Sequence, residues 1–247
     1  MFAKLDEAKE KARTVLDSFD KRRTAILHKA FTGELTQKWR EENDVNLESW
    51  VIKDFSEVAK IKSNLVQPID YLNAPHIAPD NIEKTTGVLL DYNTIAEDGV
   101  TSGKHRFYSG QILYSKIRPY LSKVVMVDFD GLCSADMYPI EANENVKYLW
   151  YYMLSDAFLD QASNAGSRSV LPKINQKEMS KIRIPMCNIE EQDEIVRILD
   201  KIFEKERQAK ELTSVIEKID HMKKAIRSRA FRGELGTNSP EEESALN

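Results

Sequence analysis

Side chains that could recognise phosphate or a nucleic-acid base are concentrated in a few short segments of this sequence. The first is SKIRPYL at 115–121. Lys116 and Arg118 alternate with Ile117, so on a strand both cations would share one face while Ile117 points to the core. Arg118 then fits a guanine reader or a phosphate fork, and Tyr120 fits stacking or hydrogen bonding. The alternative is that Arg118 forms a structural ion pair.

Two further segments carry the same kinds of groups. In AGSRS at 165–169 a glycine lets the backbone approach a ligand, and in TSGKHRF at 101–107 we expect a loop tip that grips phosphate. The alternatives are an ordinary polar loop and a solvated charge cluster. The candidate nucleic-acid-binding residues are Lys104, Arg106, Lys116, Arg118, Tyr120, Ser167, Arg168, Lys173 and Asn175.

The charge distribution supports this prediction better than the net charge does. The formal net charge of −4 counts against a nucleic-acid partner. Residues 99–127, however, contain lysines and arginines and no acidic residue, and residues 166–185 carry a single acid, Glu178. A basic face on an acidic body is therefore expected, and that face is what meets phosphate.

Other classes of site have little support. No Gly-x-Gly pair and no Walker A lysine occur, so the usual dinucleotide, S-adenosylmethionine and nucleotide loops are not indicated. Pro79-Asp80 with Glu83-Lys84 has the wrong spacing for a nuclease motif and is interpreted as a turn and helix start. The two cysteines favour free buried thiols in a reducing cytoplasm, and the four histidines are too scattered for a zinc site. We expect no metal, no cofactor and no catalysis in this chain. No apolar run is long enough to span a membrane, so no membrane association is expected.

Two long helices are expected to position these segments. In residues 3–31 and 190–231, apolar residues recur three and four positions apart. Asn188 is placed to cap the start of the second helix, and Gly33 and Gly233 follow the ends of the two helices. Between them, β-rich runs are expected at 87–95, 111–117, 121–129 and 181–186, and one buried helix at 148–162. The fold class is α+β: a globule flanked by two long helices, which run antiparallel if they pair as a coiled coil. The expected pairing residues are Ala12, Val15, Phe19, Ile26, Phe31, Leu212, Val215, Ile219, Met222, Ile226 and Phe231.

The two helices are related by an internal duplication. AFTGEL at Ala30–Leu35 recurs as AFRGEL at Ala230–Leu235, an offset of 200 residues. Identical residues also fall at Asp20, Ala25 and Ile26 under the same offset. The alternative of two unrelated amphipathic helices does not account for the shared Phe-x-Gly-Glu-Leu ending.

In several ordered motifs the chain resembles the specificity subunit of type I restriction–modification systems. These motifs are KRRTAILHKAFTGELTQKWREEN (21–43), GQILYSKIRPYLSKVVMV (110–127), GLCSADMYPI (131–140), SNAGSRSVLPKINQKEMSKIRIPMCNIEEQDEIVRILD (163–200) and KKAIRSRAFRGEL (223–235). The resemblance implies that the globule is a target recognition domain for one half of a split DNA site. It also implies that the helices form a coiled-coil spacer on which methyltransferase subunits dock, and restriction subunits where present. S-adenosylmethionine would then lie on the methyltransferase subunit.

The resemblance departs from the family in one respect. A full specificity subunit has two recognition domains, and one globule is expected here, so the chain is either a half-subunit that dimerises or the C-terminal part of a longer one. A coiled-coil scaffold or truncated decoy that binds proteins without reading DNA is the alternative function. The expected segments are a first spacer helix (1–35), a linker (36–50), the recognition domain (51–187), a second spacer helix (188–235) and a disordered tail (236–247).

Overall fold

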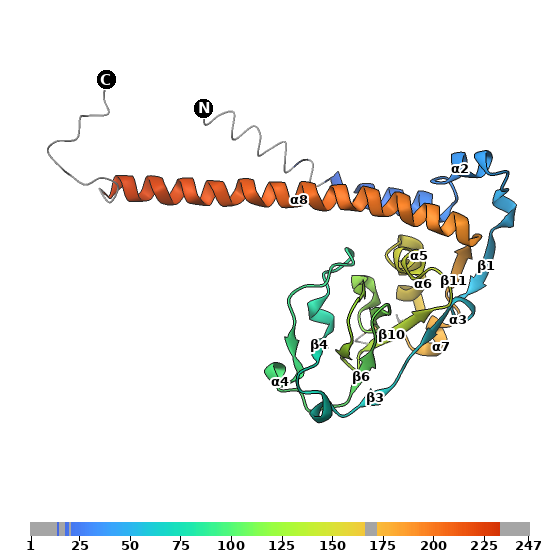
Figure 1. Ribbon diagram of the computed structural model, residues 1–247, viewed down its shortest axis with the longest axis horizontal. Coiled ribbons are helices and arrows are strands. Elements are labelled where there is room, and N and C mark those ends of the chain that lie inside the picture. The colour runs from blue at the N-terminus through green and yellow to red at the C-terminus, as the bar shows by residue number, and fades with distance from the viewer. Residues whose placement is uncertain (1–13, 15–17, 20, 166–171, 233–247) are drawn as a thin grey trace, which may run out of the picture. The chain divides into compact units, whose positions relative to one another are not determined.

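The computed structural model describes residues 14, 18–19, 21–165 and 172–232, and only the backbone at 212–223, 226–227 and 230. The chain divides into two compact units, one made of Met1–Lys21 with Asp200–Asn247 and the other of Arg22–Leu199. The larger unit contains the sheets, and its mixture of helices and strands confirms the expected α+β class (Figure 1).

The first long helix is helical at every described position up to residue 31, as expected. Leu27, Ala30 and Phe31 are buried on one of its sides. Gly33 follows with φ +82°, the left-handed conformation that ends many helices and that glycine adopts without strain. A Cβ at this position would also collide with the side chain of Leu47. Both the backbone conformation and the lack of space therefore require glycine here.

Short helices and turns connect this helix to the sheets and link the strands. The α-helices of the larger unit before the last long helix are α2 (Gln37–Glu42), α3 (Phe55–Val58), α4 (Ile95–Asp98), α5 (Val146–Met153), α6 (Asp156–Ala165) and α7 (Gln176–Met179). The 3-10 turns are η1 (Leu47–Ser49), η2 (Pro68–Tyr71), η3 (Pro79–Asn81) and η4 (Pro119–Leu121). The turn η3 confirms the expected turn at Pro79.

The described strands of the larger unit form three sheets. A four-stranded antiparallel sheet has the order β2 (Ala59–Ile61), β10 (Met137–Ala142), β7 (Ile112–Ser115), β8 (Val124–Met126). A five-stranded sheet has the order β3 (Leu65–Val66), β6 (Lys104–Phe107), β9 (Gly131–Cys133), β4 (Pro75–Ile77), β5 (Asn93–Thr94), and only β4 and β9 run parallel within it. The antiparallel pair β1 (Val51–Asp54) and β11 (Arg183–Met186) makes the third.

The main core lies between the two larger sheets. Ile77, Phe107 and Cys133 from the five-stranded sheet pack in one cluster with Leu113 and Val125 from the four-stranded sheet. The other face of the four-stranded sheet is covered by α5 and α6, which lie next to one another (Figure 1). Because both faces of β7 are buried, Ile112, Leu113 and Tyr114 follow one another without the polar alternation of a half-exposed strand.

Several sequence expectations need correction. The segment 148–162 is two helices, because Ser155 accepts a hydrogen bond from the Phe158 backbone N–H and so begins a new helix at α6. In the segment 87–95 only β5 is a strand. The strand at 181–186 does not stop at Pro185 but runs to Met186, since β11 pairs on one side only and can accommodate a residue without an N–H.

The last helix, α8, runs from Ile189 to Phe231, close to its expected bounds. At about 1.5 Å per residue it is on the order of 65 Å long. The side chain of Asn188 accepts the Glu191 backbone N–H at 2.8 Å, which confirms the expected N-cap. Glu190 and Glu191 in the first turn complement the positive end of the helix dipole.

Candidate nucleic-acid interface

The segment SKIRPYL does not continue as a strand. β7 ends at Ser115, and Arg118 has φ +48°, in the left-handed region, immediately before η4. The predicted alternation of Lys116 and Arg118 on one strand face is therefore wrong. The turn forms because Pro119 has no N–H for a strand ladder and because the Arg118 N–H donates instead to the Pro172 carbonyl at 2.7 Å.

The side chain of Lys116 is held by other groups of the protein. Its ammonium donates to the Ala135 carbonyl and lies 5.1 Å from the centre of the Tyr138 ring. Burial lowers the pKa of Lys116, the nearby charge of Lys173 lowers it further, and Asp136 opposes both. Such a side chain orders the loop around it and is less available to phosphate than the sequence suggested.

Arg118 and Tyr120, in contrast, are exposed. Tyr120 has 51% of its surface accessible, and no side-chain hydrogen bond or ion pair of Arg118 is found among the described residues. The structural ion pair considered as an alternative for Arg118 is thus not seen there. A left-handed arginine followed by proline is an uncommon backbone conformation, and such strain is often found at functional positions.

The structure brings this segment next to the second predicted one. Ile117 forms a β-bridge with Lys173, and the Ile174 N–H donates to the Lys116 carbonyl at 2.9 Å. Lys173 lies 3.7 Å from Asp136 and stays half exposed. We call Arg118, Tyr120 and Lys173 the loop cluster. Ser167 and Arg168 lie outside the described residues.

Asn175 has a capping role instead of a free side chain. Its Oδ1 accepts the Glu178 N–H, while its own N–H donates to the Glu178 carboxylate, both at 2.9 Å. This reciprocal pair is a capping box at the start of α7. Capping of α7 therefore explains why asparagine occupies this position.

TSGKHRF is not a loop tip, because Lys104–Phe107 form β6, which lies between β3 and β9 in the five-stranded sheet. Phe107 joins the core, so the period of two places His105 on the core side and Lys104 with Arg106 on the other. Lys104 is buried, donates to the backbone carbonyl and hydroxyl of Ser102, and has a pKa lowered by burial. Its predicted phosphate contact has no structural support.

Arg106 lies against two tyrosine rings that we did not single out from the sequence. Its guanidinium carbon is 4.8 Å from the centre of the Tyr108 ring and 5.4 Å from that of Tyr71. These are cation–π distances. Tyr108 could have been found from its spacing of two from Arg106, had the segment been predicted as a strand. Tyr71 is the last residue of the turn η2, and its sequence position gives no sign that its ring contacts Arg106.

Two strands further along the same sheet, polar groups fix β4 and β5. The Asp98 carboxylate binds His76 Nδ1 at 2.6 Å and accepts from the Asn93 amide at 2.8 Å. The hydrogen bond from His76 is the main reason that the pKa of Asp98 lies below its usual value. His76 Nε2 is buried and has no hydrogen-bond partner within the part of the chain that the structure describes.

The helix positions predicted for partner binding have different environments. Phe31 is buried within its own chain, its ring 5.3 Å from that of Tyr148 and 5.0 Å from that of Tyr152, both edge-on. It is therefore not available to a partner, which corrects that expectation. Phe19 is buried, Ile26 half-buried and Phe231 is 93% exposed. Ala12 and Val15, and the side chains of Leu212, Val215, Ile219, Met222 and Ile226, lie outside the description.

Both cysteines are free and buried, as expected from the sequence. Among the described residues no group of three or more potential metal ligands gathers. No described helix is long and apolar enough to cross a membrane.

Comparison with known proteins decides the family. Residues 46–218 match the family described as type I restriction modification DNA specificity domain. The chain belongs to this family. It is also 42% identical over 257 residues to the type I restriction enzyme EcoDI specificity subunit of Escherichia coli, covering 95% of this chain and 58% of that protein.

Solved structures of such subunits share the fold. The HsdS subunit from Thermoanaerobacter tengcongensis matches with a TM-score of 0.50 at 19% identity, over 94% of this chain and 57% of that one. The type I restriction–modification S subunit from M. genitalium matches with a TM-score of 0.57 at 15% identity, over 89% and 56%. This specificity-family chain thus spans somewhat more than half the length of the relatives it matches.

Proposed function

We propose that this chain recognises one half of a split DNA site for a type I restriction–modification complex and has no catalysis of its own. The observation that carries the proposal is the loop cluster, found in a chain that belongs to the DNA specificity family. Arg118 and Tyr120 are exposed at the end of a strand that the core fixes, and Lys173 is held beside them by a β-bridge. A guanidinium, a phenol and an ammonium together can hydrogen-bond base edges and neutralise phosphate.

The long helices would act as the spacer. Met1–Lys21 and Asp200–Asn247 belong to one compact unit, which supports pairing of the first helix with α8. An antiparallel pair of duplicated helices would offer a methyltransferase subunit two similar docking surfaces, and a restriction subunit could join the same complex. S-adenosylmethionine would be bound by the methyltransferase, and the complex would work in the cytoplasm. The second recognition domain would come from a second copy of this chain, from another half-subunit or from the rest of a longer subunit.

The test is a map of DNA methylation. The chain is expressed with its methyltransferase subunit in an unmethylated host, and methyladenine is located by single-molecule sequencing. We expect an interrupted motif, palindromic if two copies of this chain act together and asymmetric if another recognition domain supplies the second half. Absence of any motif, with both subunits present and co-purifying, would contradict DNA reading and favour a protein-binding scaffold.

A further inference from the structure

On the side of the five-stranded sheet away from the main core, Arg106 and two tyrosines form a second group of side chains suited to DNA. Leu132 and His76 on this side are buried, whereas Arg106 is partly exposed. His105 and Phe107 point from β6 to the core, so Arg106 points the opposite way. Arg106 is paired with Leu132 of β9, and Leu132 with His76 of β4. The guanidinium therefore starts from a central strand, where the backbone position is fixed by neighbours on both sides.

The two tyrosines that hold Arg106 are themselves anchored. The Tyr108 N–H donates to Oε1 of the buried Gln111 at 3.0 Å. The Tyr71 carbonyl accepts from Ala74 at 2.9 Å, and the next carbonyl, that of Leu72, accepts from the first turn of α4. Hydrogen bonds thus hold the backbone at both tyrosines. Together the two rings restrict rotation of the Arg106 guanidinium.

Fixed orientation distinguishes base reading from phosphate binding. A phosphate needs a nearby positive charge, and a mobile lysine supplies it well. Guanine presents O6 and N7 side by side, and an arginine must aim two N–H groups at them to bind both. Guanine reading therefore requires a guanidinium of fixed orientation, and the two tyrosine rings hold Arg106 in this way.

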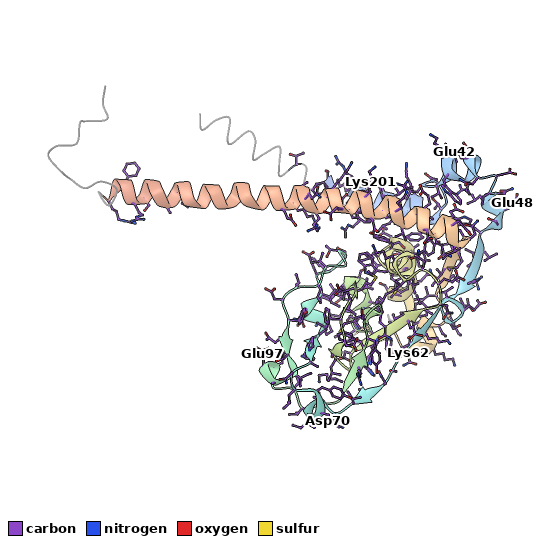
Figure 2. The ribbon with its side chains drawn as sticks, viewed as in Figure 1. Glu42, Glu48, Lys62, Asp70, Glu97 and Lys201 are labelled. Atoms are coloured by element: carbon purple, nitrogen blue, oxygen red, sulfur yellow. The ribbon has the colours of Figure 1, made fainter. Side chains whose placement is uncertain are left out.

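The side chains around Tyr71 agree with contact to bases. Ile69 is 72% and Leu72 45% exposed, and exposed aliphatic groups of this kind suit the methyl group of thymine. Asp70 is exposed between them, and a carboxylate can accept from the amino group of cytosine but repels phosphate. Asp70 and Glu97 lie at the end of the Arg22–Leu199 unit away from Glu42 and Glu48 (Figure 2).

We infer that Arg106 reads a guanine through its O6 and N7 in the major groove, with Tyr71 and Tyr108 as positioning residues. This inference rests on the proposed function and adds a base-reading element on the sheet, separate from the loop cluster. Lys104, on the same strand face, is buried and donates to the Ser102 carbonyl, so we expect no DNA contact from it.

The experiment uses the full chain with its methyltransferase subunit and a duplex containing the methylated motif. Each guanine of the motif is replaced in turn by 7-deazaguanine, which lacks N7, and affinity is measured for wild type, Arg106→Ala and Arg106→Lys. We expect one replacement to weaken wild-type binding roughly 10- to 100-fold. Arg106→Ala should bind the unmodified motif more weakly and be indifferent to that replacement, while keeping wild-type affinity for unrelated DNA. Arg106→Lys keeps a donor and should discriminate less than wild type.

Further variants separate positioning from folding. Tyr108→Phe keeps the ring and should keep guanine discrimination, whereas Tyr108→Leu should lose it without a change in melting temperature. The inference is overturned if Arg106→Ala discriminates like wild type, or if it weakens motif and unrelated DNA by the same factor, as loss of a phosphate contact would. If the wild-type complex itself shows no sequence preference, the proposed function fails and the inference with it.

Discussion

The buried carboxylate of Glu191 lies 2.6 Å from the guanidinium of Arg40, which joins the linker after the first helix to the first turn of α8. Its Oε1 also accepts from Thr36, and its Oε2 accepts from the indole of Trp50 at 2.8 Å. The other end of the Arg40 guanidinium donates to the Gly33 carbonyl. The end of the AFTGEL motif is thus connected to the start of the second long helix through one satisfied carboxylate.

Breaking this ion pair should cost much of the stability of the Arg22–Leu199 unit. Removing one partner of a buried pair leaves the other charge uncompensated, so Arg40→Ala should lower the free energy of unfolding by about 3–5 kcal/mol. The control is Lys38→Ala, because Lys38 pairs with Glu42 on the exposed side of the same helix and such pairs contribute less than about 1 kcal/mol. Urea unfolding of both variants checks the difference. Equal effects would show that the pair contributes no more than a surface contact.

The internal repeat provides a matched pair of phenylalanines. Phe31 is held by two tyrosines, whereas Phe231, at the equivalent position, is 93% exposed. We expect Phe31→Ala to destabilise the chain by roughly 3–5 kcal/mol, through lost burial and the cavity left behind. Phe231→Ala should change stability by about 0.5 kcal/mol or less. Thermal melting of the isolated chain distinguishes them, and a large loss with Phe231→Ala would mean that this side chain is buried in solution.

Where the sequence predicted structure well, the signal was local. Gly33 and Asn188 mark helix ends because a left-handed turn and a side-chain cap each depend on one residue and its immediate neighbours. The fold class and the α8 helix follow from periodicity over long segments.

The site was harder to predict because its geometry depends on distant partners. Arg118 leaves the strand to bond with Pro172, and Arg106 gains its aromatic support from Tyr71, some 35 residues earlier in the chain. Lys104 and Asn175 have types suited to DNA, yet nearby backbone groups already occupy them. Residue type alone does not distinguish a free side chain from a satisfied one.

The buried thiols predict a loss of stability at alkaline pH. Burial raises the pKa of both Cys133 and Cys187 to about 12, from an ordinary value of 9.0. Between these values the unfolded chain releases thiol protons that the folded chain retains, so stability is complete below pH 9 and falls as the pH rises toward 12. Unfolding by urea at pH 8, 9 and 10 measures the slope, which Cys133→Ala with Cys187→Ala should reduce. An unchanged slope in that double variant would rule the thiols out as its source. Neither thiol should react with iodoacetamide in the folded chain at pH 8.

Arg118 permits a test that separates its side chain from its backbone. In the left-handed conformation at φ +48° a glycine is less strained than an arginine, by roughly 1 kcal/mol, although glycine also gains entropy in the unfolded chain. Arg118→Gly should therefore be as stable as wild type within about 1 kcal/mol, and Arg118→Ala should be no more stable than Arg118→Gly.

If the guanidinium contacts DNA, both variants should nevertheless lose the same affinity. If Arg118 binds phosphate, its loss should lower the salt dependence of binding by about one charge for all sequences. If it binds a base, its loss should relax the preference at one position by about 1–3 kcal/mol. Fluorescence anisotropy with the methyltransferase complex at several salt concentrations measures both quantities. Lys38→Ala is the control for a cation outside the loop cluster and should bind as wild type. Wild-type affinity and salt slope in Arg118→Gly would show that the strained loop has a structural role alone, and would leave Lys173 and Tyr120 to account for any contact made by this cluster.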